Sequence, residues 1–125
     1  MEATRLVEGS ASGDALVLDE PLSFWGGLDP LTGEIIEVNH PQRGQRVTGR
    51  ILVMPSGRGS SSSATVLAEA IRLGTGPAGI VLGEPDQIIA IGALVAAELY
   101  GTRIPVVVAV GDELSFVADG SSIDL

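Results

Sequence analysis

Three stretches in the second half of the chain are apolar at nearly every position, which is typical of strands buried on both faces. They are residues 50–54 (RILVM), 78–83 (AGIVLG) and 104–110 (IPVVVAV). Between them, apolar residues recur at helical spacing over 64–74 and again over 87–100, and each pattern is closed by a glycine, Gly74 or Gly101. This order predicts a parallel β-α-β-α-β core with helices against one face of a sheet.

The segments on either side of this core are predicted to be strands and turns. The apolar run 15–18 and the run 35–38 predict strands, and 24–33 (FWGGLDPLTG) predicts a structured loop anchored by Phe24 and Trp25. Residues 112–125 alternate loosely about the turn at Asp119-Gly120 and predict a terminal hairpin. The predicted fold class is therefore α/β, with additional N-terminal and C-terminal strands.

Composition narrows the range of functions. The 125 residues suit one domain, and seven arginines, no lysine and sixteen acidic residues give a net charge of −9, which argues against a nucleic-acid partner. With no cysteine the chain has no thiolate to hold an iron–sulfur cluster or a cysteine-based zinc site, so any such cofactor is expected on another chain. The sequence has neither a signal-peptide pattern nor a long apolar segment, so we expect a soluble, cytoplasmic protein without membrane contact.

The most unusual stretch is PSGRGSSSS at 55–63, between the first buried strand and the first helix. Gly57 and Gly59 allow backbone conformations in which N–H groups converge, and the helix N-terminus adds partial positive charge, so the loop favours an anionic oxygen. A catalytic serine without a nearby histidine needs such donors, and Arg58 adds a guanidinium. The alternative is structural, because serine is a preferred N-cap and Gly/Ser loops are common linkers.

Three further positions are candidates with a structural alternative beside each. His40, the one histidine, lies in a turn (NHP) and could orient substrate, or be a surface histidine without a role. Gly27 belongs to a loop that could reach a cleft, or simply form a rigid turn. Asp86 follows a buried strand at the end of the sheet where ligands gather, but is expected to be a helix N-cap.

The chain resembles the aconitase X family, in the small subunit or swivelling domain. The resemblance rests on four stretches, LSFWGGLDPLTGEII, NHP, GRILVMPSGRGSSSS and AGIVLGEPDQIIAIGALVA. It implies a swivelling β/β/α domain that closes over the active site of a larger subunit. It also implies that this partner carries an iron or iron–sulfur centre, that the two form a heterodimer or larger assembly, and that this chain binds no metal.

The resemblance also implies roles for the residues of the serine loop. Aconitase-type enzymes are hydro-lyases in which a serine of the swivelling domain removes a substrate proton, and Ser60 matches that base. Ordinary aconitases have an arginine after the serine pair, where this chain has Ser62, so Arg58 becomes the candidate for the substrate carboxylate. Gly59 and Ser61 complete the expected substrate-binding loop.

Two activities occur in the family. Bacterial members dehydrate cis-3-hydroxy-L-proline to pyrroline-2-carboxylate, and archaeal members dehydrate phosphomevalonate; the serine run with Arg58 favours the first. A non-catalytic swivelling module that grips an anion is the alternative from another class. A serine hydrolase is disfavoured because there is no G-x-S-x-G elbow, and a P-loop because there is no lysine.

Overall fold

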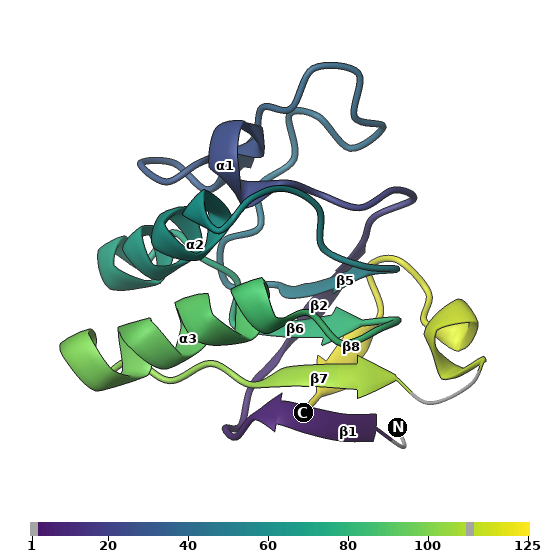
Figure 1. Cartoon of the computed structure of the whole chain (residues 1–125). Helices are drawn as coiled ribbons and strands as arrows, with labels where there is room; N and C mark the ends of the chain where they lie inside the picture. Colours follow the sequence, from purple (N-terminus) through teal and green to yellow (C-terminus); the bar gives the residue numbers. More distant parts are fainter. Residues whose placement is uncertain (1–2, 110–111) are drawn as a thin grey trace.

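A six-stranded mixed sheet dominates the structure, a computed structural model that describes residues 3–109 and 112–125. Within these residues the strand order is β1-β7-β6-β5-β2-β8 (Figure 1). The strands are β1 (Ala3–Val7), β2 (Ser12–Val17), β5 (Ile51–Met54), β6 (Gly79–Leu82), β7 (Val106–Ala109) and β8 (Ser122–Asp124). The four central strands are parallel to one another, and β1 and β8 run antiparallel at the two edges.

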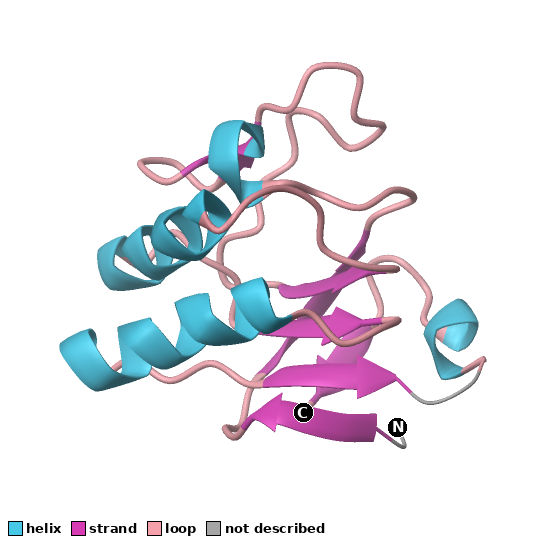
Figure 2. Ribbon diagram, in the orientation of Figure 1, coloured by secondary structure: helices cyan, strands magenta, loops and turns pink. Residues whose placement is uncertain are grey.

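Two long helices, α2 (Ser62–Leu73) and α3 (Gln87–Tyr100), cover one face of the sheet (Figure 2). On this side Leu52 and Met54 of β5 join the larger core cluster with Leu67 of α2. Their neighbours in β5, Ile51 and Val53, belong to a second cluster that is covered by partly buried residues of the C-terminal segment. Both faces of the central strands are thus buried, which is why these strands are apolar without alternation.

A smaller layer lies above the first long helix. It contains α1 (Phe24–Gly27), which packs on α2, and a short antiparallel pair, β3 (Leu28–Asp29) and β4 (Glu34–Ile35) (Figure 1). The predicted strand at 35–38 is therefore only two residues long and begins one residue earlier. Ile36 and Val38, which contributed to the strand prediction, are exposed.

The predicted α/β fold with a parallel β-α-β-α-β core is confirmed, because β5, α2, β6, α3 and β7 follow one another in that order. The predicted bounds of α3 agree with the structure, whereas α2 begins at Ser62 rather than at Ala64. Val110, the last residue of the third predicted strand, lies outside the described residues.

Two further predictions are wrong. The segment 112–125 does not form a hairpin: Glu113–Phe116 is a 3₁₀ helix, and β8 pairs with β2, which lies about a hundred residues away in sequence. β8 completes the open edge of β2, where unpaired backbone groups would otherwise remain. Phe24 anchors its loop as predicted, at 1% exposure, but Trp25 does not, because it is 61% exposed.

Candidate functional site

The serine loop (residues 55–61) joins the carboxyl end of β5 to the start of α2. Gly57 forms a bridge with Leu22 and lies against the start of α3. A Cβ at Gly57 would collide with Asp86 Oδ2 and would lie 2.6 Å from Ile89 Cδ1. Asp86 is held there because its Oδ1 accepts the Ile89 N–H at 3.0 Å, which confirms the predicted N-cap. The loop is therefore packed against two neighbouring segments and is not a plain linker.

The four serines divide into one buried and three exposed residues. Ser63 is buried, and its Oγ accepts the Trp25 N–H at 3.2 Å, which ties α2 to α1. Ser60, Ser61 and Ser62 are exposed, and Ser60 Oγ accepts the Ser62 N–H at 3.3 Å. Ser61 stands at the N-cap position without a side-chain capping bond. One serine thus has a structural role, and the hydroxyls of the other three are accessible to a ligand or a partner.

Gly59 fixes the path of the chain just before Ser60. Its φ of +110° lies in the region that favours glycine. A Cβ there would collide with Ser23 Oγ and lie 3.1 Å from Ser63 Oγ. Both hydroxyls are already engaged with Trp25, since Ser23 Oγ donates to its carbonyl at 3.0 Å and Ser63 Oγ accepts from its N–H. The segment before α1 therefore packs directly against the serine loop.

Arg58 forms an ion pair with Glu37, in which Nη2 donates to Oε2. The other carboxylate oxygen of Glu37 accepts the Ser23 N–H at 3.1 Å. Gly27 packs against the same carboxylate. A Cβ at position 27 would lie 3.0 Å from Glu37 Oε1. The predicted candidates Arg58 and Gly27 are thus brought together through Glu37, which is not among the residues predicted from the sequence. The signal for Glu37 was a single charged residue within the apolar run 35–38.

His40 lies away from solvent, at 4% exposure, and is not a surface histidine. Its Nδ1 accepts the Gln42 N–H at 3.0 Å, so the proton of the ring resides on Nε2, which donates to the Glu20 carbonyl at 3.2 Å. Both ring nitrogens are consequently used within the chain. This arrangement favours a histidine that holds the 36–44 loop over one that contacts substrate.

Replacing His40 with alanine is expected to lower the free energy of unfolding by about 2 kcal/mol, because two part-buried backbone groups lose their partners. His40→Asn, which can still accept the Gln42 N–H, is expected to lose less. Denaturant unfolding of the two variants measures this difference. A variant that keeps full stability but loses affinity for a ligand would instead indicate a ligand contact at His40.

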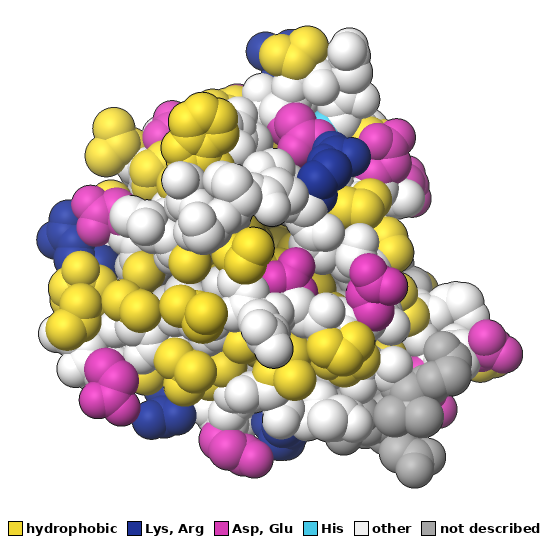
Figure 3. All heavy atoms as spheres, viewed as in Figure 1, with side chains coloured by type: hydrophobic (Ala, Val, Ile, Leu, Met, Phe, Trp, Pro, Cys, Tyr) yellow, Lys and Arg dark blue, Asp and Glu magenta, His cyan; other side chains and the backbone are white. Residues whose placement is uncertain are grey.

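The outer surface of the two long helices is hollowed. A groove of about 700 Å³ lies between α2 and α3, with Ser61 at the end nearest the serine loop and Leu99 and Tyr100 among its other lining residues. Hydrophobic side chains gather over this face of the molecule (Figure 3). The serine loop thus borders this mostly apolar groove through Ser61.

Within residues 3–109 and 112–125, no group of three or more His, Cys, Asp or Glu side chains could hold a metal ion. The described residues therefore do not fit an iron centre. In the same part of the chain, no helix is both long enough and apolar enough to cross a membrane.

A family model of the aconitase X swivel domain matches residues 1–125. The chain belongs to this family. The crystal structure of holo-form aconitase X from Thermococcus kodakaraensis superimposes on this chain with a TM-score of 0.87 and 33% sequence identity. The superposition covers 98% of this chain and 88% of the chain in the crystal structure. The family resemblance and the swivelling-domain fold expected from the sequence are confirmed.

Two relatives of this aconitase X domain have named activities. Over 101 residues the chain is 50% identical to the cis-3-hydroxy-L-proline dehydratase of Pseudomonas aeruginosa. The aligned residues are 81% of this chain but only 17% of that protein. Over 88 residues it is 44% identical to the phosphomevalonate dehydratase small subunit of Methanopyrus kandleri, covering 70% of this chain and 65% of that subunit. The chain therefore spans less than a fifth of the first relative.

Proposed function

We propose that this aconitase X domain is the small subunit of a hydro-lyase that dehydrates cis-3-hydroxy-L-proline to pyrroline-2-carboxylate. The observation that carries the proposal is the 50% identity to a dehydratase of that name. The exposed hydroxyl of Ser60, which follows the positive-φ Gly59 just before the start of α2, supports it. The 44% identity to a phosphomevalonate dehydratase small subunit makes phosphomevalonate the alternative substrate.

In this proposal Ser60 is the general base. Ser60 takes the proton from the carbon that bears the carboxylate, and the hydroxyl of the neighbouring carbon leaves, protonated, as water. The resulting enamine tautomerises to pyrroline-2-carboxylate. A serine alkoxide needs hydrogen-bond donors, and the Ser62 N–H already donates to Ser60 Oγ at 3.3 Å. The N-terminus of α2 adds a favourable dipole at the same place. This donor and the helix dipole favour the charged oxygen over the neutral hydroxyl once the loop is shielded from water.

The neighbours of Ser60 would bind the substrate. Arg58 is the candidate for the substrate carboxylate, because a guanidinium donates to both oxygens of that group. Gly59 is exposed, so a ligand can approach its backbone, and Ser61 and Ser62 add two exposed hydroxyls. Gly27 acts indirectly, by leaving room for the carboxylate that pairs with Arg58.

The exposure of Ser60 supports a second component of the active site. A base in contact with bulk water gains little from fixed donors, because water screens them, so the site needs a surface that covers the loop. We infer that this surface is the aconitase X large subunit, in a heterodimer or larger assembly. The iron or iron–sulfur centre belongs to that subunit, since the described residues here do not fit one.

The test is a dehydration assay of this chain alone, of the large subunit alone and of their mixture, with cis-3-hydroxy-L-proline and 5-phosphomevalonate offered separately. We expect turnover of cis-3-hydroxy-L-proline by the mixture and none by either component. Turnover of phosphomevalonate instead would assign the alternative activity. No turnover of either substrate, combined with phosphate or carboxylate binding by this chain alone, would favour the non-catalytic module.

A further inference from the structure

We propose that Glu37 is a positioning residue that holds the Arg58 guanidinium in one place, so that Arg58 meets the substrate carboxylate without first being ordered. The inference rests on the proposed function, in which Arg58 binds that carboxylate. It adds a residue from a distant part of the sequence to the site, since Glu37 lies 21 positions before Arg58.

Glu37 joins three segments at one point. One carboxylate oxygen accepts from Arg58 in the serine loop, and the other accepts the Ser23 N–H at 3.1 Å. Ser23 in turn lies against Gly59, next to Ser60. Gly27 packs on the Glu37 side chain, and its missing Cβ leaves room for the carboxylate. The carboxylate is therefore fixed by its own surroundings and can in turn fix the guanidinium.

The exposures of the two side chains fit this division of roles. The Glu37 side chain is 19% exposed and that of Arg58 is 47% exposed, so the carboxylate lies behind the guanidinium. A guanidinium has five N–H donors, and among the described residues Glu37 is the one side chain that accepts from it. The remaining donors of Arg58 are thus available to an anion on the solvent side.

A carboxylate this close to the site would by itself repel an anionic substrate. Its presence is explained by Arg58, which stands between two glycines, Gly57 and Gly59, and whose long side chain would otherwise sample many rotamers. Pairing with Glu37 removes that freedom before substrate arrives. Binding then loses less entropy than it would with an unpaired arginine.

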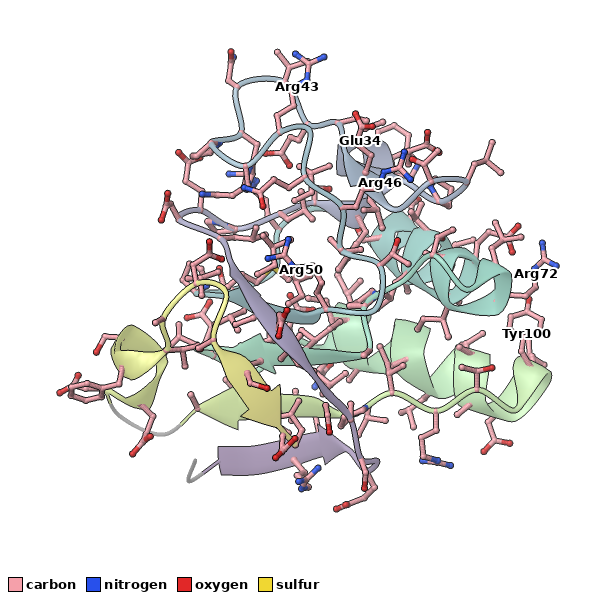
Figure 4. The ribbon with its side chains drawn as sticks, turned by 180° about the vertical axis from the view of Figure 1, so that it is seen from behind. Glu34, Arg43, Arg46, Arg50, Arg72 and Tyr100 are labelled. Atoms are coloured by element: carbon pink, nitrogen blue, oxygen red, sulfur yellow. The ribbon has the colours of Figure 1, made fainter. Side chains whose placement is uncertain are left out.

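The first test measures order in the isolated 125-residue chain by ¹⁵N relaxation at Arg58 Nε. In the wild type we expect an order parameter of about 0.8, and in Glu37→Gln a value below about 0.6. The matched control is Glu69→Gln, which removes the partner of Arg72 at the far end of α2, beside Tyr100 (Figure 4). In this control the order parameter at Arg58 Nε must equal the wild-type value. An Arg58 that is equally ordered in wild type and Glu37→Gln would overturn the inference, whatever the enzyme's activity.

The second test uses the assembled enzyme with cis-3-hydroxy-L-proline. We expect Glu37→Gln to raise KM about tenfold with kcat within about threefold, the pattern of lost uniform binding. Arg58→Gln should behave alike, and the double variant should be no worse than Arg58→Gln alone, because both act through one interaction. Glu37→Asp, which keeps the charge, should recover part of the affinity.

The two proposals fail in different ways. Wild-type assembly without turnover would remove the proposed function, and the relaxation experiment would still decide whether Glu37 orders Arg58. Normal wild-type turnover, together with an unchanged KM in Glu37→Gln or with additive effects in the double variant, would overturn the role of Glu37 alone. A fall in kcat at constant KM would also count against it, because a positioning residue for the carboxylate acts on binding.

Discussion

Replacing Ser60 with alanine is expected to lower kcat of the proposed dehydratase assembly by about 10³-fold with little change in KM, the size of effect that general-base catalysis supplies. In the proposed mechanism the substitution removes the hydroxyl that takes the substrate proton, while Arg58 and the backbone of the loop remain to bind substrate. Such a loss corresponds to about 4 kcal/mol of transition-state stabilisation. Steady-state kinetics of the reconstituted enzyme measure it.

The folded state should change little in the same variant. Ser60 is exposed, and its side chain contributes one hydrogen bond, from the Ser62 N–H, so the free energy of unfolding should fall by only about 0.5–1 kcal/mol. Thr65→Ala removes an exposed hydroxyl one turn further along α2 and is the matched control, with kcat expected to be unchanged. If Ser60→Ala retained a rate within a few-fold of wild type, another group would have to be the base.

The core of the fold could be predicted because its residues carry the pattern themselves. Strands β5, β6 and β7 are buried on both faces, so each appears in the sequence as a continuous apolar run. The edge strands lack that signal: β1 carries the exposed residues Thr4 and Arg5, and β8 is three residues long. Both become strands because they pair with β7 and β2, and this depends on tertiary structure.

The residues of the candidate site likewise fall into those that the local sequence pattern indicates and those that only the fold reveals. Arg58, Gly59 and Ser60 are adjacent in the sequence, so the Gly/Ser pattern and the following helix marked them together. Glu37 reaches Arg58 only because the chain folds back over the serine loop, and nothing in its own neighbourhood indicates that partner. The sequence also could not show that Phe24 is buried while Trp25 is exposed. Two adjacent aromatic residues in a loop have the same local pattern, although their side chains lie in different surroundings.

Replacing Gly59 with alanine is expected to affect both stability and catalysis. The left-handed φ of +110° is unfavourable for alanine, and the new methyl group would collide with Ser23 Oγ. Strain of this kind costs about 1–3 kcal/mol in the free energy of unfolding. The loop can relieve the collision only by moving, and Ser60 moves with it. A displacement of about 1 Å at a catalytic group can lower the rate by about 100-fold.

Gly44→Ala separates these two causes. Gly44 also has a positive φ, +96°, but no heavy atom lies within 4 Å of the position its Cβ would take. It should therefore show the backbone strain alone, about 1–2 kcal/mol, with unchanged kcat. Denaturant unfolding and kinetics of both variants in the assembled enzyme make the comparison. Equal kinetics for Gly59→Ala and Gly44→Ala would mean that the packing of Gly59 against Ser23 does not position Ser60, and the base would then have to be held by the partner's surface.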